Sequence, residues 1–107
     1  MAERPQWTFI TTHALVLLAV ERQPSASVGE LAEVVGIKDR HVRRVLADLE
    51  AEGYITRQRN IGRHNYYTVH HDRPMRHSSF MGQRIGNLIS VFTGEGEPPQ
   101  IAAATGR

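Results

Sequence analysis

Cysteine is absent from this chain of 107 residues, and its absence excludes two ways of stabilising a small protein. Without thiols, the chain can form neither a disulfide framework nor a zinc site with thiolate ligands. The length fits one domain with a small core, which a partner subunit would help to stabilise. The lack of cysteine is also compatible with a reducing compartment.

Long apolar runs are missing as well. The longest one extends from Ala14 to Val20, which is far too short to cross a bilayer. The beginning of the chain lacks the basic start and the small-residue cleavage site of a signal peptide. We therefore expect a cytoplasmic protein with no membrane partner.

Patterns typical of enzymes are also absent. The chain has no cysteine nucleophile, no glycine-rich phosphate loop and no pair of carboxylates in an apolar setting. The acidic residues Asp48, Glu50 and Glu52 have the helical spacing of solvent-exposed side chains. We predict that the protein is not an enzyme and needs no cofactor.

Positive charge is concentrated in the middle of the chain, although the net charge is only +2. Residues 38–77 carry nine Lys or Arg against five Asp or Glu, together with five of the six histidines. Residues 1–37 have a net charge of −2, and residues 78–107 are neutral overall. The middle segment is therefore the candidate surface for a polyanion, and a solvated basic face is the alternative.

Apolar periodicity and capping residues predict three helices in the first half of the chain. Thr12 is the predicted cap of the first helix, and Ser27 and Glu30 have the spacing of a capping box for the second. Gly36 and Gly53 are the residues that end the second and third helices. The predicted helical ranges are 13–22, 28–35 and 39–52.

A β-hairpin is predicted after the third helix. Residues 54–58 and 64–70 have β character, and the segment between them reads as a turn. Asn60 and Gly62 can take positive φ angles in this turn. The chain therefore continues from three helices into a hairpin.

The second and third helices have the spacing of a helix-turn-helix unit. Ala32 lets the two helices approach closely, and Gly36 allows the sharp turn between them. Val42 and Val45 pack the third helix back onto the second. This pattern resembles the helix-turn-helix family, and the hairpin that follows identifies the winged variety. The resemblance implies a mainly α fold with a small β-hairpin, in which residues 1–77 form a DNA-binding domain with an N-terminal arm.

The third helix separates apolar from cationic side chains. At 100° per residue, Arg40, Arg44 and Ala47 lie opposite the apolar stripe that starts at Val42. A helix fits the major groove of B-DNA, where arginine suits guanine O6 and N7, and hairpin cations can contact phosphates or the minor groove. A surface helix whose arginines serve solubility is the alternative. The predicted DNA-binding residues are Lys38, Asp39, Arg40, His41, Arg43, Arg44, Arg57, Arg59, Asn60, Arg63 and His64.

Three segments extend the resemblance to a narrower group. Residues 7–13, 27–53 and 71–77 together look like those of short actinobacterial winged-helix regulators, which are usually described as MarR-like. This resemblance implies a transcriptional regulator that binds double-stranded DNA and forms a homodimer. It supplies neither a target sequence nor a small-molecule effector. Lys38 stands where related helices often carry a capping Ser or Thr, so the alternatives are Asp39 as the cap or a weak cap.

Residues 78–92 are predicted to form a dimerisation helix, which is capped by Ser78 or Ser79 and helical from Phe80. Its apolar residues are spaced four, three and four apart, as in the seam of a short coiled coil. A helix that packs only on its own domain is the alternative. Residues 93–107 contain one large apolar residue, and we expect this tail to be disordered. The predicted dimerisation residues are Trp7, Phe9, Met81, Ile85, Leu88, Ile89 and Phe92.

Histidines after the hairpin raise the question of a metal site. His70, His71, Asp72 and His77 carry groups that bind Zn²⁺ or Ni²⁺, and His13 could join them in space. Neighbouring residues on a strand point to opposite sides, which disfavours one ion shared by His70 and His71. We therefore predict no metal site. Two alternatives to a plain DNA-binding regulator remain, namely a winged-helix protein-interaction module and a metal- or ligand-gated repressor.

Overall fold

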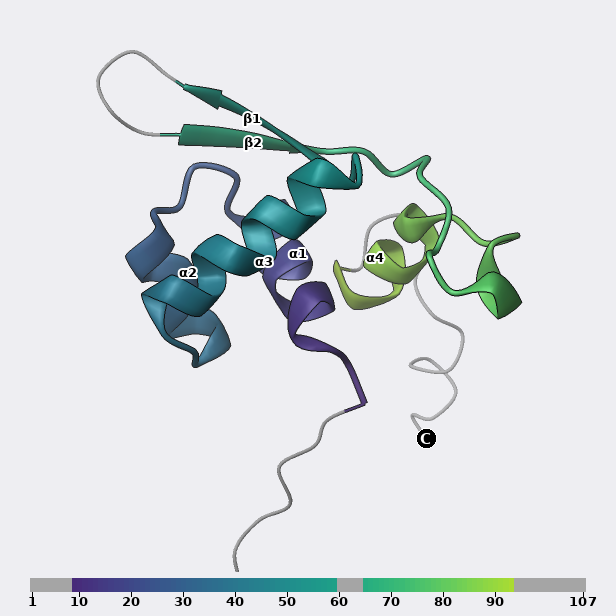
Figure 1. Cartoon of the computed structure of the whole chain (residues 1–107), viewed down its shortest axis with the longest axis horizontal. Helices are drawn as coiled ribbons and strands as arrows, with labels where there is room; N and C mark the ends of the chain where they lie inside the picture. The colour runs from purple at the N-terminus through teal and green to yellow at the C-terminus, as the bar shows by residue number, and fades with distance from the viewer. Residues whose placement is uncertain (1–8, 60–64, 94–107) are drawn as a thin grey trace, which may run out of the picture.

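The computed structural model describes residues 9–59 and 65–93. A group of helices carries a two-stranded hairpin that projects from it (Figure 1). The predicted mainly helical fold with one hairpin is confirmed. In chain order the elements are α1 (Thr12–Arg22), α2 (Val28–Val35), α3 (Asp39–Ala51), β1 (Ile55–Arg59), β2 (Asn65–Val69), a short 3-10 helix (Ser78–Phe80) and α4 (Ile85–Thr93). Within the described ranges, no helix has the length and apolarity needed to cross a membrane.

Side-chain caps decide where α1 and α2 begin. Thr11 rather than Thr12 caps α1, because its hydroxyl accepts a hydrogen bond from Ala14 N at 3.2 Å. The predicted capping box of α2 is confirmed: Ser27 Oγ accepts from Glu30 N at 3.1 Å, and Ser27 N donates to Glu30 Oε1 at 2.8 Å. Each side chain satisfies a main-chain N–H that the first turn of a helix leaves unpaired.

The turn between α2 and α3 depends on Gly36. Its φ of +86° lies in the left-handed region, which residues with a Cβ rarely adopt. Lys38 is the N-cap residue of α3 but its side chain makes no capping bond, and Asp39 is the first residue of the helix. Asp39 is therefore not the cap, although its carboxylate in the first turn is favourably placed for the helix dipole.

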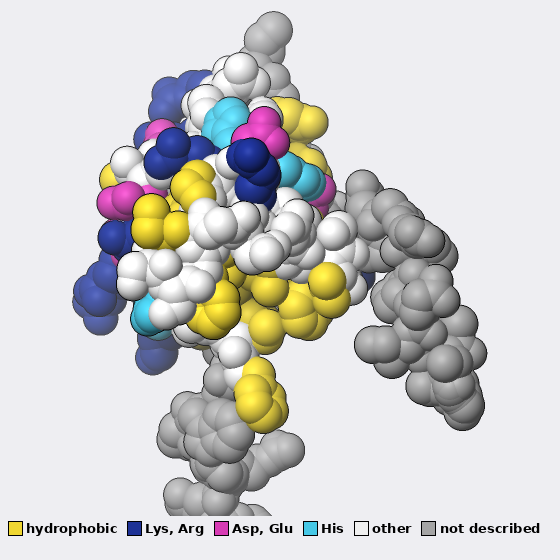
Figure 2. Space-filling view, turned by 90° about the vertical axis from the view of Figure 1, so that its right-hand side faces the viewer, with side chains coloured by type: hydrophobic (Ala, Val, Ile, Leu, Met, Phe, Trp, Pro, Cys, Tyr) yellow, Lys and Arg dark blue, Asp and Glu magenta, His cyan; other side chains and the backbone are white. Residues whose placement is uncertain are grey.

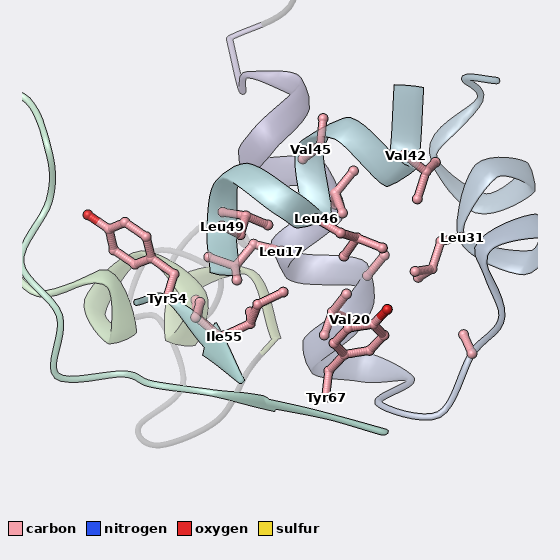
Figure 3. Packing of buried hydrophobic residues seen from close by; sticks show 14 of the residues in the cluster. Leu17, Val20, Leu31, Val42, Val45, Leu46, Leu49, Tyr54, Ile55 and Tyr67 are labelled. Carbon is pink, nitrogen blue, oxygen red and sulfur yellow. The ribbon is translucent and has the colours of Figure 1, made fainter. Parts of the chain in front are cut away.

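One hydrophobic core joins the first three helices to the base of the hairpin. Side chains from α1, α2, α3 and both strands converge in it (Figure 3). Leu17 of α1 and Leu31 of α2 are almost completely buried, and Leu49 belongs to the buried stripe of α3. Ile55 and Tyr67 extend the cluster into the hairpin. The orientation of the hairpin relative to α3 is therefore set by packing at its base.

The hairpin has an apolar base and a cationic outer part on the same face. β1 and β2 pair antiparallel, with Ile55 opposite Val69 and Arg59 opposite Asn65. Because side chains alternate along a strand, Ile55, Arg57 and Arg59 share one face. Ile55 is buried in the core, whereas the two arginines are exposed. The face that packs on the helices at its base thus continues outward as a row of cations.

The last helix is shorter than predicted. α4 begins at Ile85 rather than at residue 80, and Met81 lies in a turn before it. The predicted capping serines belong to the 3-10 helix Ser78–Phe80 instead. The chain before α4 folds back on the segment that follows the hairpin, where Met75 N donates to Gln83 O at 2.9 Å. This pairing engages main-chain groups that a longer helix would need.

Two residues of the predicted dimerisation seam belong to the core of their own chain. Ile85 is 8% exposed and Ile89 is fully buried, because α4 packs against α1. The prediction that these two side chains face a partner is therefore wrong. Leu88 is half-buried against the same core, whereas Phe92 is exposed. Trp7 and the tail after residue 93 lie outside the described residues.

Candidate nucleic-acid interface

One row of α3 side chains points away from the core. Arg40, Arg44 and Ala47 are exposed, and they lie opposite the fully buried Val42 and Val45. The predicted separation of a cationic and an apolar face along this helix is confirmed. Neither arginine side chain forms an ion pair or hydrogen bond with any described residue. Both guanidinium groups are therefore available to a ligand.

Two acidic residues of α3 are paired with neighbouring elements on the flanks of this row. On one flank, His13 Nε2 of α1 donates to Asp48 Oδ2 at 2.8 Å. On the other flank, Glu50 Oε1 lies 3.9 Å from Arg57 Nη2 of β1. These carboxylates consequently face α1 and the hairpin instead of the row of arginines.

The hairpin continues the cationic surface. The contact between Arg57 and Glu50 places the cationic face of β1 beside α3. Arg59 lies two residues farther out on that face and is exposed. The remaining hairpin residues that were predicted to bind DNA lie outside the described residues, namely Asn60, Arg63 and His64.

The other predicted residues of α3 surround the central row. Lys38 is exposed at the N-cap, Asp39 and His41 are exposed in the first turn, and Arg43 is exposed on the flank that carries Glu50. The structure thus brings the described part of the predicted site together on one surface. In Figure 2, Lys and Arg side chains gather along the left edge of the molecule, away from an apolar area near the centre.

The histidines that raised the question of a metal site are dispersed. His13 binds Asp48, His70 hydrogen-bonds with Thr56 Oγ1, and His71 Nε2 lies 3.0 Å from Glu21 Oε1. Within residues 9–59 and 65–93, no three groups of the ligand types gather closely enough to hold a metal ion. Each of these histidines instead pairs with one residue of another segment: His13 links α1 to α3, His70 bridges the base of the hairpin, and His71 links the segment after the hairpin to α1.

A hollow of about 640 Å³ lies on another side of the molecule, between the start of α1, the end of α3 and α4. Apolar side chains such as Ala14, Leu49 and Leu88 line most of it. His13 and Arg76 also line it, and they bring polar groups to the hollow. Sequence periodicity did not reveal this feature, because its walls come from segments far apart in the chain.

Two residues with structural roles beside the site were missed by the sequence interpretation. Glu50 forms an ion pair with Arg57 of the hairpin. Arg73 Nη2 donates to Glu52 O at the end of α3, at 2.9 Å. The spacing of Arg43 and Glu50 by seven residues was a signal for a shared flank. No sequence signal indicated Arg73, because its contact depends on how the chain returns after the hairpin.

Residues 8–64, which include α1 to α3 and β1, match the sequence profile of the MarR family. The chain belongs to the MarR family. Proteins of the MarR family are DNA-binding transcription regulators and not enzymes. A comparison with curated proteins finds no match.

A solved structure with the same fold comes from the PcaV transcriptional regulator of Streptomyces coelicolor, which was crystallised in complex with its natural ligand. The superposition has a TM-score of 0.53 and covers 89% of this MarR-family chain and 68% of PcaV, at 22% sequence identity. At this identity the likeness establishes the fold. The actinobacterial origin that the sequence resemblance implied stays a prediction.

Proposed function

We propose that this MarR-family protein regulates transcription by inserting α3, its recognition helix, into the major groove of double-stranded DNA. The observation that carries the proposal is the exposed row of Arg40 and Arg44, which lies opposite the buried stripe of α3 and has no partner among the described residues. A bidentate guanidinium is well matched to the O6 and N7 atoms of guanine. Ala47 keeps the outer face of the helix thin enough for close approach.

The hairpin is the second part of the proposed interface. Arg57 and Arg59 lie on the face that continues from the hairpin base past α3. Cations at this position can contact the phosphate backbone or enter the minor groove beside the major groove that holds α3. We therefore assign base readout to α3 and orientation on the duplex to the hairpin.

The experiment begins with selection of a preferred site from random duplex DNA. Arg40→Ala and Arg44→Ala should each weaken binding to that site by about 1–3 kcal/mol and relax its specificity. Arg22→Ala is the matched control, since it removes the same charge from the last turn of α1. Affinities are measured by fluorescence anisotropy over a range of salt concentrations, because phosphate contacts make binding salt-dependent.

Equal affinity of the parent and both α3 variants would refute the assignment of the recognition helix. If the parent protein bound no duplex DNA at low salt, the alternative of a winged-helix protein-interaction module would be favoured instead. The charged row argues against that module, because the cores of protein interfaces are depleted in charge.

We also propose that the protein acts as a homodimer in the cytoplasm. Val91 and Phe92 at the end of α4 are 63% and 51% exposed, and Phe80 and Met81 are exposed near its start. Large exposed apolar side chains at both ends of α4 are candidates for an interaction surface. A two-fold arrangement would present two copies of α3 to a palindromic site.

Val91→Glu tests the dimer, because it places a charge on the exposed side of α4 without disturbing the core. Light scattering at micromolar concentration should show a dimer for the parent and a monomer for the variant, together with weaker binding to a palindromic site. A monomeric parent would end the dimer proposal and leave the DNA-binding proposal intact.

A ligand-gated regulator is the second candidate, and the hollow between α1, α3 and α4 favours it. Its volume of about 640 Å³ falls within the usual range of small-molecule sites, and apolar walls with a few polar groups are typical of them.

The test is a thermal-shift screen of small aromatic and aliphatic molecules. A true effector should raise the melting temperature and change DNA affinity, and Ala14→Phe, which fills the hollow, should abolish both effects. Compounds that raise the melting temperature of the parent and of the Ala14→Phe variant equally would argue against this site.

A further inference from the structure

Residues 70–76, the connector between the hairpin and α4, are hydrogen-bonded along two edges. One edge holds the beginning of α4: Gly86 N donates to His71 O at 2.9 Å, and Ile85 N donates to Arg73 O at 2.7 Å. The other edge holds the region where α3 passes into β1. There, the hydroxyl of Tyr54 donates to the carbonyl of Pro74. The connector therefore lies between α4 and the recognition helix and touches both.

Arg73 contacts both elements at once. Its carbonyl accepts the hydrogen bond from the first residue of α4, while its Nη2 donates to Glu52 O, just past the last residue of α3, at 2.9 Å. Its guanidinium carbon lies 5.9 Å from the centre of the Tyr54 ring. A Cβ added to Gly53 would lie 3.1 Å from Arg73 Nε, so the glycine also makes room for the guanidinium.

A hydrogen bond to the end of α3 can affect the orientation of the whole helix. The last carbonyls of a helix lack partners within the helix and carry partial negative charge. A charge-assisted hydrogen bond from a guanidinium is stronger than a neutral one, so it holds that end of the helix against the connector. The direction of α3 in turn sets the direction of the row that contains Arg40 and Arg44.

We propose that Arg73 is a positioning residue that couples α4 to the recognition helix, so that a displacement of α4 changes the affinity for DNA. The proposal rests on the proposed function of α3. It assigns Arg73 no contact with DNA, because its guanidinium is engaged with Glu52 and Tyr54. It gives α4 a regulatory role through the hydrogen bonds that run from α4 to the connector and from the connector to the end of α3, a chain of contacts of the kind that can carry coupling between separate sites.

The test displaces α4 by a substitution at Gly86. A Cβ at this position would lie 2.8 Å from the Cβ of His71 and 3.0 Å from its carbonyl oxygen, so Gly86→Ala must push α4 and the connector apart. Gly82→Ala is the matched control, because the same change there meets nothing within 4 Å. DNA affinity is measured for the full chain with each change in the parent and in an Arg73→Ala background.

Arg73→Ala should lower the affinity for the selected site about 5- to 150-fold, the usual range for coupled sites. The salt dependence of binding should not change, whereas loss of a phosphate contact would lower its slope by about one. Gly86→Ala should weaken DNA binding in the parent and have less than about a third of that effect, on a logarithmic scale, in the Arg73→Ala background. Gly82→Ala should leave DNA affinity unchanged in both backgrounds.

Equal effects of Gly86→Ala in the two backgrounds would overturn the proposal, as would parental affinity of a folded Arg73→Ala variant. Circular dichroism at the assay temperature establishes that each variant is folded. If Arg73→Ala does not fold, Tyr54→Phe takes its place, because it removes only the hydroxyl that donates to the carbonyl of Pro74 in the connector. Failure of the DNA-binding proposal would look different, since Arg40→Ala and Arg44→Ala would then bind like the parent.

Discussion

Replacement of Ile89 by Ala tests whether α4 belongs to the core of its own chain. Ile89 is fully buried, and the substitution removes three carbon atoms from it. At roughly 0.8 kcal/mol per buried methylene, the transfer contribution is about 2.4 kcal/mol. The cavity left behind raises the expected loss of unfolding free energy to about 3–4 kcal/mol.

Val34→Ala is the matched control for this prediction. Val34 lies in α2, outside the proposed dimer surface, and its side chain is 61% exposed. Both substitutions replace a β-branched residue by Ala in a helix, so the small gain in helix propensity is nearly the same. The difference between the two variants consequently reports burial at Ile89.

Urea denaturation followed by circular dichroism measures the two free energies. We expect Ile89→Ala to unfold with about 3 kcal/mol less free energy than Val34→Ala, which corresponds to a melting temperature lower by at least about 10 °C. The difference should persist when the protein is diluted tenfold, because a dimer interface would make it depend on concentration. A difference below about 1 kcal/mol would refute the intrachain packing of α4.

Two further predictions concern the helix-turn-helix unit. Ser27→Ala should reduce the unfolding free energy by about 1 kcal/mol, because it removes the hydroxyl that accepts from Glu30 N, whereas Ser25→Ala, outside the capping box, should change it by less than about 0.5 kcal/mol. Gly36→Ala should cost about 1–2 kcal/mol, because φ is +86° there, and Gly82→Ala, which lacks a positive φ, provides the comparison in the same denaturation assay. Parental stability of either Ser27→Ala or Gly36→Ala would contradict the local geometry described for that residue.

Local sequence signals predicted the helix-turn-helix unit well, because each signal depends on neighbours within one or two turns. Ser27 and Glu30 define a cap within four residues, and the stripe of α3 repeats at helical spacing. The exposed row of Arg40 and Arg44 follows from the same periodicity. These features were therefore accessible before the fold was known.

Predictions failed where long-range pairing overrides local preference. The apolar pattern from Met81 to Phe92 resembled one continuous seam, yet the pairing of Met75 with Gln83 delays the helix until Ile85. Burial of Ile89 against α1 also could not be deduced, because spacing alone does not say which partner covers an apolar stripe. The contact of Arg73 with the end of α3 had no local sequence signal for the same reason.

The outer row of α3 is separate from the flanks that contact α1 and the hairpin, and this has a consequence for how such a protein can evolve. The side chains of Arg40, Arg44 and Ala47 make no hydrogen bond or ion pair with any described residue, while Asp48 and Glu50 contact the neighbouring elements on the flanks of the helix. Under the proposed readout by α3, substitutions in this row should therefore alter which operator is preferred at little cost in stability. Changes of target sequence can then accumulate without compensating changes in the core. Regulators with new specificities could arise from this scaffold by a few surface replacements.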